Sequence, residues 1–303
     1  MSEKAIEVKQ LAKAFGSFQA VRDVSFSVNK GDVFGFLGPN GAGKSTTIRC
    51  LLSLIKPNAG EVKLFGMQYN GNRAAILSRI GSIIEKPDFY KYLSAQKNLE
   101  IFARISGADV NKKQILEMLD FVGLSGREGD KVGGFSHGMK QRLGIAQTLL
   151  HQPDLIILDE PTTGLDPQGI VEIRNLILRL KNEQNKTILL SSHQLSEIEL
   201  IANRMVIINR GKSIVEGEVQ ALLNAQELVL RVETNEVEKA LQLIQNKWGQ
   251  TTVLHRSETD FEVVAEKSQV AEINRLLVNA GLVVDALEPR RKLEDFFMKI
   301  ISE

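Results

Sequence analysis

A glycine-rich segment between two regular elements constrains this sequence more than any other feature. Residues 38–46 read Gly-Pro-Asn-Gly-Ala-Gly-Lys-Ser-Thr and match the pattern G-x-x-x-x-G-K-[ST] without a mismatch. The apolar run 33–37 before it predicts a strand, and residues 46–54 after it predict a helix that ends before Pro57. A strand, a phosphate-binding loop and a helix in this order predict a nucleoside triphosphate site.

The residue types in this loop suit a triphosphate. Glycines at 38, 41 and 43 let successive backbone N–H groups point at one phosphate chain. The helix N-terminus behind the loop adds a favourable positive dipole. We expect Lys44 to reach the β- and γ-phosphates and the Ser45 hydroxyl to bind Mg²⁺. The expected nucleotide-binding set in this loop is Gly38, Pro39, Asn40, Gly41, Ala42, Gly43, Lys44, Ser45 and Thr46.

Two adjacent carboxylates, Asp159 and Glu160, follow the apolar strand predicted at residues 155–158. Neighbouring side chains leave a strand in different directions. Asp159 can therefore serve Mg²⁺ through water while Glu160 faces an attacking water, a division of labour that suits phosphoryl transfer. The alternative is a buried strand that ends in a polar turn.

Two further segments carry polar groups at predicted helix starts. His193 follows the strand predicted at 187–191 and could hydrogen-bond a γ-phosphate, although a histidine there can also be an ordinary surface or capping residue. Ser136 and Gly138 stand at the start of the helix predicted at 139–150. They form either a second anion site at a helix N-terminus or only a helix capped by Ser136.

The chain has 303 residues, enough for two domains, and its net charge of +1 makes no general case for nucleic-acid binding. Lys and Arg outnumber Asp and Glu up to residue 226, whereas the acidic residues prevail beyond it, which supports a boundary there. The single Cys50 excludes an internal disulfide framework. No apolar stretch approaches the ~18–20 residues that span a bilayer, so membrane work would need a partner.

The order of the predicted elements indicates the architecture. The first ~65 residues predict mainly strands, residues 94–150 helices, and residues 155–208 alternating strands and helices, as in a parallel sheet covered by helices. The helices form a separate lobe at 86–150. From residue 228 a βαββαβ order predicts a ferredoxin-like unit with a last helix at 293–301.

Taken together in this order, the motifs resemble the nucleotide-binding subunit of an ATP-binding cassette (ABC) transporter over residues 5–220. Residues 38–46 resemble its Walker A loop, 155–160 its Walker B strand with the catalytic glutamate, 164–166 its D-loop, and His193 its switch histidine. Residues 136–139 stand at its signature loop, where Ser136 and Gly138 are kept but the neighbouring residues differ. Phe15 stands where an aromatic stacks on adenine, and Glu85 replaces the Q-loop glutamine, where it can still bind Mg²⁺.

The resemblance implies an α/β P-loop ATPase domain of ABC type, with a mixed sheet and an inserted helical lobe, and a small α+β ferredoxin-like domain. The implied domains are residues 1–225, with the lobe at 86–150, and 226–303. The implied cofactors are ATP and Mg²⁺, with Glu160, His193 and Lys44 catalytic and Ser45, Asp159 and Glu85 near the metal.

The implied function is ATP binding and hydrolysis that drive separately encoded membrane permease subunits. The sequence variants and the extra C-terminal domain resemble exporter ATPases of the antibiotic- and lantibiotic-resistance type. Ser136 and Gly138 would contact ATP held by a second ATP-binding subunit, identical or not, and no nucleic acid is expected. The implied location is cytoplasmic, peripheral on the inner face of the cell membrane through the partners. The aromatic residues Phe89, Tyr90 and Tyr92 either dock a membrane partner or pack within the lobe.

Three alternatives remain at this point. An ABC ATPase could act on a soluble partner without transport, although such proteins usually carry two cassettes or a long coiled coil. A P-loop kinase would have no use for residues 136–138 and would need an acceptor-binding lid. Residues 227–303 could also be a regulatory ligand-binding module, although they carry no cofactor motif.

Overall fold

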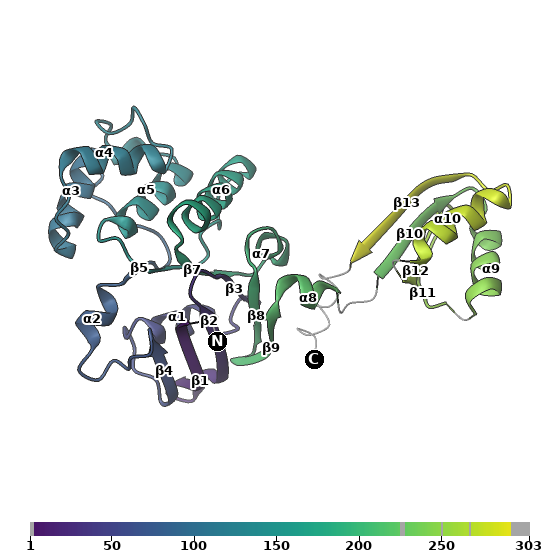
Figure 1. Ribbon diagram of the computed structural model, residues 1–303, viewed down its shortest axis with the longest axis horizontal. Coiled ribbons are helices and arrows are strands. Elements are labelled where there is room, and N and C mark those ends of the chain that lie inside the picture. The colour runs from purple at the N-terminus through teal and green to yellow at the C-terminus, as the bar shows by residue number, and fades with distance from the viewer. Residues whose placement is uncertain (1–2, 225–227, 250, 267, 292–303) are drawn as a thin grey trace. The chain divides into compact units, whose positions relative to one another are not determined.

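The computed structural model describes residues 3–224, 228–249, 251–266 and 268–291. Two compact units divide the chain, Met1–Val219 and Gln220–Glu303 (Figure 1). The boundary predicted at 225/226 falls within 225–227, and the helix predicted at 293–301 falls within 292–303. Both predictions therefore lie outside the described residues.

The first unit contains strands and helices in mixed order. Its strands are β1 (Lys4–Phe15), β2 (Phe18–Asn29), β3 (Val33–Leu37), β4 (Ala59–Leu64), β5 (Ile80–Ile83), β6 (Leu155–Leu158), β7 (Thr187–Ser192), β8 (Arg204–Asn209) and β9 (Lys212–Glu218). Its helices are α1 (Lys44–Leu51), α2 (Arg73–Leu77), α3 (Ala95–Ser106), α4 (Lys112–Phe121), the 3₁₀ turn Val132–Gly134, α5 (His137–Leu149), α6 (Pro167–Gln184) and α7 (Leu195–Ile201), and α8 (Val219–Asn224) follows.

The strands of the first unit form one nine-stranded sheet in the order β4-β1-β2-β9-β8-β3-β7-β6-β5. Strands β3, β5, β6, β7 and β8 run parallel, whereas β1, β2 and β4 pair antiparallel, as do β8 and β9. The sheet is therefore mixed, and the alternation of strands and helices predicted only its parallel part. Strand β9 was not predicted because none of its residues is fully buried, so it lacks the continuous apolar run that marks β3 and β6.

The centre of the sheet is buried on both faces. Every residue of β3 and β6 is buried, and the rings of Phe34 and Phe36 are fully covered. Burying an aromatic or aliphatic side chain of this kind stabilises the fold by about 1.5–3 kcal/mol relative to leaving it exposed. The rigid centre ends in the loops that carry the candidate site.

Helices α3, α4 and α5 form the helical lobe (Figure 1). The Ser94 hydroxyl accepts from the Lys97 N–H at the start of α3, and Asn111 and Gln114 form a capping box on α4. Phe89 is buried in this lobe, with its ring centroid 6.0 Å from that of Phe102. The idea that Phe89 docks a partner is therefore wrong.

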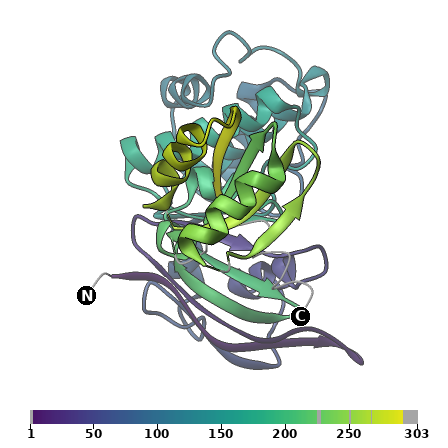
Figure 2. The same cartoon turned by 90° about the vertical axis from the view of Figure 1, so that its right-hand side faces the viewer.

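From Leu228 to Arg291 the described residues of the second unit follow the βαββαβ order predicted for it. Its elements are β10 (Leu228–Thr234), α9 (Val237–Trp248), β11 (Val253–Arg256), β12 (Asp260–Ala265), α10 (Gln269–Asn279) and β13 (Val284–Arg291). The sheet order is β11-β12-β10-β13 and every neighbouring pair is antiparallel. The two helices of the β-α-β-β-α-β order lie over one face of this sheet (Figures 1 and 2).

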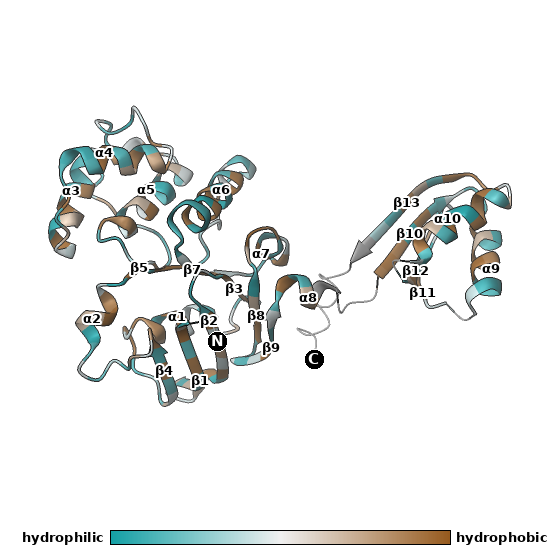
Figure 3. Ribbon diagram, viewed as in Figure 1, coloured by the Kyte–Doolittle hydropathy of each residue, from teal (hydrophilic) through white to brown (hydrophobic). Residues whose placement is uncertain are grey.

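Apolar side chains hold the second unit together from both layers. Leu230 and Phe261 of the sheet are fully buried against Leu241 of α9 and Ile273 of α10. In Figure 3 hydrophobic colouring runs along β10, while α9 and α10 alternate between hydrophobic and hydrophilic colouring, as helices with one buried side do. This unit therefore has a core of its own.

Candidate active site

The phosphate-binding loop lies between β3 and α1, as predicted. Gly43, directly before α1, has φ of 102°, and a Cβ there would lie 2.6 Å from the Ala20 carbonyl oxygen. A Cβ on Gly38 would lie 2.5 Å from the Ile208 carbonyl oxygen. Glycine at 38 and 43 is therefore required by close backbone approaches, in addition to any contact with a phosphate.

A cleft of about 210 Å³ opens above this loop. Its lining residues are Phe18, Ala20, Asn40, Gly41, Gly43, Lys44, Ser45, Thr46 and Glu160. Of the residues predicted to bind nucleotide, Gly38, Pro39, Ala42, Ser136 and Gly138 are not in this lining, and neither is Phe15. It is 49% exposed, and Lys13 Nζ lies 5.1 Å from the centroid of its ring.

Phe18 is the aromatic residue that lines the cleft, and the sequence analysis missed it. It faces Phe15 across the hairpin of β1 and β2, where the two residues pair in register. Two aromatic residues separated by Gly16 and Ser17 are a hairpin signal, which could have drawn attention to Phe18. Both aromatics thus remain candidates for stacking on a base.

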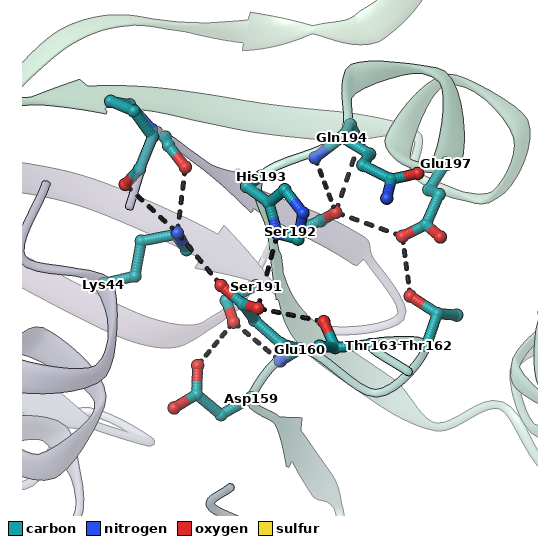
Figure 4. Close-up of polar contacts among 12 residues, drawn as sticks. Lys44, Asp159, Glu160, Thr162, Thr163, Ser191, Ser192, His193, Gln194 and Glu197 are labelled. Atoms are coloured by element: carbon teal, nitrogen blue, oxygen red, sulfur yellow. Dashed lines mark hydrogen bonds and ion pairs between the residues drawn. The ribbon is translucent and has the colours of Figure 1, made fainter. Parts of the chain in front are cut away.

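Lys44 is buried and points at the backbone and at a carboxylate. Its Nζ donates to the carbonyl oxygens of Gly38 (2.9 Å) and Pro39 (3.3 Å) and lies 3.1 Å from Glu160 Oε1. These contacts satisfy a charge whose side chain is 5% exposed. These contacts hold the Lys44 ammonium group beside the phosphate-binding loop, where its charge can meet a phosphate (Figure 4).

Asp159 and Glu160 follow β6 and are fixed by one hydroxyl from the neighbouring strand β7. Ser191 Oγ donates to Asp159 Oδ1 (2.5 Å) and accepts from the Glu160 N–H (2.9 Å). Glu160 has φ of 48°, an unusual backbone conformation for a residue other than glycine. The two carboxylates therefore leave the strand end in fixed and different directions, as Figure 4 shows.

Several groups act on the ionisation of Glu160. Burial raises its pKa, but hydrogen bonds from Lys44 and Thr163, and the charges of Lys44 and His193, outweigh burial. They hold the pKa of Glu160 below its ordinary value of 4.5. Glu160 is therefore an ionised acceptor at neutral pH, as a group that takes a proton from water must be.

His193 lies beside Glu160, although 33 residues separate them in the sequence. Its Nδ1 is 3.3 Å from Glu160 Oε2, without the alignment of a hydrogen bond. The structure thus brings together Lys44, Glu160 and His193, which the sequence placed in three separate motifs.

The candidate metal ligands are oxygens at the end of β6 and in the first turn of α1. Asp159 is buried, and Ser45 lines the cleft. Mg²⁺ usually takes one or two protein oxygens and completes its shell with phosphate and water, so this small donor set fits. Among the described residues no cluster of three or more His, Cys, Asp or Glu side chains could hold a metal by itself.

Glu85, the third predicted metal residue, makes a different contact. It follows β5 with φ of 65°, and its carboxylate forms an ion pair with Arg49 of α1. The Glu85 side chain is 67% exposed. Glu85 does not line the cleft, and Arg49 partly balances its charge.

The signature segment starts α5 and does not line the cleft. The Ser136 hydroxyl caps this helix by accepting from the Met139 N–H (3.2 Å). His137 Nδ1 lies 3.1 Å from the carbonyl oxygen of Gly164, so the segment touches the loop that follows Glu160. Gly138 lies beside Gly169 of α6: a Cβ on it would be 4.0 Å from the Gly169 Cα.

The fold and this site define a P-loop ATPase, and comparison with known proteins gives its family. The family model described as ABC transporter matches residues 21–163. A second model, described as "AAA domain, putative AbiEii toxin, Type IV TA system", matches residues 131–199. The chain belongs to the ABC transporter ATP-binding proteins, as the curated relatives show.

Two relatives illustrate the match. The bacitracin transport ATP-binding protein BcrA of Bacillus licheniformis is 43% identical over 299 residues, which are 98% of this chain and 97% of that protein. The lantibiotic transport ATP-binding protein SrtF of Streptococcus pyogenes is 42% identical over 223 residues, which are 74% of this chain and 95% of SrtF.

Solved structures agree on the fold. The ADP conformation of MJ1267, an ATP-binding cassette of an ABC transporter, is 27% identical with a TM-score of 0.66 and covers 73% of this chain and 95% of its own. The dimeric structure of MJ0796, a bacterial ABC transporter cassette, is 25% identical with a TM-score of 0.63. The match covers 71% of this chain and 98% of the MJ0796 chain. The predicted fold class is confirmed.

The comparisons also confirm the predicted ATPase activity. The chain is an ATP-binding, ATP-hydrolysing subunit of the ABC transporter type. No helix in the described part of the chain has both the length and the apolar character needed to cross a bilayer.

Proposed function

We propose that this chain drives the efflux of a bacitracin-like peptide antibiotic through a separately encoded permease. The observation that carries the proposal is the extent of the likeness. Two proteins named as bacitracin transport ATP-binding proteins align over 98% and 99% of the chain, including the second unit. The lantibiotic relative covers 74% and stops short of the chain's full length.

The identity of the transported substrate is tested by measuring antibiotic resistance in a susceptible host. The chain and its cognate permease are expressed together, and the minimum inhibitory concentrations of bacitracin and of a lantibiotic are measured. We expect only bacitracin resistance to rise, and only with active ATPase, so the Glu160→Gln variant serves as the matched control. Resistance to the lantibiotic alone would reassign the cargo, and no change for either would reject a role in their export.

Within the subunit, the proposal gives each polar group a role in hydrolysis. Residues 38–46 bind the phosphates, Lys44 balances the charge of the β- and γ-phosphates, and Glu160 accepts a proton from the attacking water. His193 contacts the γ-phosphate beside Glu160. The 3.3 Å contact of His193 with Glu160 supports this arrangement.

Ser45 and Asp159 would hold Mg²⁺, with Glu85 able to join them if it leaves Arg49. When bound, Mg²⁺ would supply positive charge that offsets the negative charge developing on the phosphate groups. The chain's own contribution is to fix Asp159 through Ser191 and to place the Ser45 hydroxyl in the first turn of α1.

We further propose that two subunits share two ATP sites. The cleft above the phosphate loop contains no residue of the signature segment, so in this proposal Ser136 and Gly138 contact ATP held by another subunit. The neighbour MJ0796 has been solved as a dimer. In this arrangement Ser136 and Gly138 of one subunit contact the γ-phosphate on the other.

Mixing two inactive variants tests the shared sites. Ser136→Arg spoils the signature segment and Lys44→Ala spoils the phosphate loop, so each homodimer should be nearly inactive. A mixed dimer should regain partial ATPase activity because one of its two sites has neither substitution. Demonstrated mixed dimers without recovered activity would contradict the arrangement.

The exposed tyrosines of the lobe are the proposed contact with the permease. Tyr90 and Tyr92 are 42% and 70% exposed, with their ring centroids 6.1 Å apart. Exposed aromatic pairs of this kind often anchor protein interfaces. A Tyr90→Ala, Tyr92→Ala double variant should keep its basal ATPase rate and thermal stability but fail to retain the permease in a pull-down, and retention at the wild-type level would refute the contact.

A further inference from the structure

A buried carboxylate lies behind the two segments that carry Glu160 and His193. Glu197, in the first turn of α7, is 9% exposed. Its Oε2 accepts a hydrogen bond from Thr162 Oγ1 at 2.7 Å and a second from Ser192 Oγ at 3.1 Å (Figure 4). A buried carboxylate costs free energy unless hydrogen bonds satisfy it, and these two donors come from different loops.

The two donors stand next to the reacting groups in the sequence. Thr162 is two residues beyond Glu160, in the loop after β6, and Ser192 directly precedes His193 at the end of β7. One oxygen of Glu197 therefore joins the loop that bears the glutamate to the strand end that bears the histidine. Ser192 Oγ also accepts from the Gln194 N–H at 2.9 Å, which orders the turn that presents His193.

Other contacts in the loop after β6 connect the residues beside Thr162 to Glu160. Thr163 Oγ1 donates to Glu160 Oε2 (2.9 Å), and the Thr163 N–H donates to the Glu160 carbonyl oxygen (3.2 Å). The turn that contains Thr162 thus holds the Glu160 side chain as well as its backbone. Movement of Thr162 away from α7 would change the direction in which Glu160 points.

We propose that Glu197 is a positioning residue that keeps Glu160 and His193 in register through Thr162 and Ser192. The inference rests on the roles proposed above for Glu160 and His193. Glu197 acts as a hydrogen-bond acceptor, and its charge is not needed. Glu197 does not line the nucleotide cleft, so we expect it to affect the chemical step rather than the binding of ATP.

Two substitutions of Glu197 separate the effect of its hydrogen-bond acceptor from the effects of its charge and its volume. Glu197→Leu keeps a side chain of similar size but cannot accept a hydrogen bond. We expect it to lower kcat about 10- to 10²-fold, because small misplacements of reacting groups cost rates of this order. Glu197→Gln keeps one carbonyl oxygen for both donors and should retain most of the wild-type rate. ATP affinity should stay within about twofold of wild type in both variants.

The experiment measures single-turnover ATP hydrolysis, ATP affinity and thermal stability on the full chain. Thr148→Val is the matched control for Thr162→Val. Thr148 is also a threonine, but its buried hydroxyl donates to the Ile145 carbonyl oxygen of its own helix. This control should leave the rate unchanged. Thr162→Val removes one donor to Glu197, and in the double variant with Glu197→Leu its effect on kcat should disappear.

Each result decides the proposal. A wild-type rate in Glu197→Leu, equal losses in the Leu and Gln variants, or additive effects with Thr162→Val would overturn it. If Glu197→Leu does not fold, Thr162→Val alone must lower kcat with ATP affinity kept, and failure to do so counts equally against the proposal. Glu160→Gln is measured in parallel, since full activity there would reject the proposed role of Glu160 and leave the contacts of Glu197 without a catalytic purpose.

Discussion

Lys44 Nζ lies 3.1 Å from Glu160 Oε1, so the phosphate-loop lysine and the strand-end glutamate form an ion pair at the nucleotide cleft. A triphosphate offers Lys44 several anionic oxygens in place of one carboxylate. We therefore infer that ATP draws Lys44 away from Glu160 when it binds. The glutamate is then released toward water at the moment when the substrate has arrived.

Replacing Glu160 should separate ATP binding from hydrolysis. Glu160→Gln cannot accept a proton from water, so the rate should fall by at least about 10²-fold, as is typical for a lost general base. ATP affinity should not weaken, because Lys44 no longer has a carboxylate partner that competes with phosphate. Equilibrium binding and steady-state hydrolysis measure the two effects, and undiminished turnover would remove Glu160 from the mechanism.

The lowered pKa of Glu160 predicts how stability depends on pH. A carboxyl group whose pKa is lower in the folded state stabilises the fold above its unfolded pKa, and this stability is lost as pH falls through the folded pKa. For Glu160 the loss should therefore fall in the acid range below its ordinary value of 4.5.

Thermal unfolding of the wild type and of Glu160→Gln measures this contribution. The difference in Tm between the two proteins should be constant near neutral pH and should change toward the variant's favour on acidification, as Glu160 is protonated. A difference that does not vary with pH would show that the ion pair with Lys44 does not stabilise the fold.

Removing the Ser191 hydroxyl should disturb both carboxylates at once. Ser191→Ala leaves the buried Asp159 carboxylate and the Glu160 N–H without this partner, and each unsatisfied buried group costs about 1–3 kcal/mol. We expect lower stability in denaturant and a lower kcat. Ser78→Ala removes an exposed hydroxyl that donates to the Ala75 carbonyl oxygen and should change neither quantity. Wild-type activity in Ser191→Ala would show that the loop after β6 keeps its geometry without it.

Phe261 should be essential to the second unit. Its ring is fully buried between the sheet and both helices, and truncation of such a ring costs about 3–5 kcal/mol. Phe261→Ala should unfold this unit at lower denaturant while the first unit keeps its transition and its ATPase activity. The control is Val283→Ala, whose side chain is 54% exposed. A single shifted transition for the whole chain would show instead that the two units unfold together.

Much of the fold followed from local patterns. Strands β3 and β6 were predicted at their observed bounds, because continuous apolar runs are local properties. The phosphate loop was also predicted from the sequence. Gly38 and Gly43 must be glycine because other backbone atoms approach them closely, and this need appears directly in the sequence motif. Strand β9 was missed because its residues are half-buried or exposed and form no continuous apolar run.

The residues that support the site were not visible in the sequence. Phe18, Ser191 and Glu197 carry no motif, and their importance comes from contacts with residues far away in the chain. Phe89 and Tyr90 are adjacent and both rings lie near Phe102, yet Phe89 is buried and Tyr90 is exposed. Such choices depend on neighbours that the chain supplies only when it has folded.

The sequence alone determined the phosphate loop, the paired carboxylates Asp159 and Glu160, the histidine His193 and the family to which they belong. These features are contiguous, and their chemistry depends on residue type and short spacing. Tertiary structure decided which of them meet: Lys44 with Glu160, and Glu160 with His193. The reason is physical, because distances of about 3 Å between separate strands and loops are set by how the sheet orders its strands and how buried hydrogen bonds hold the loops.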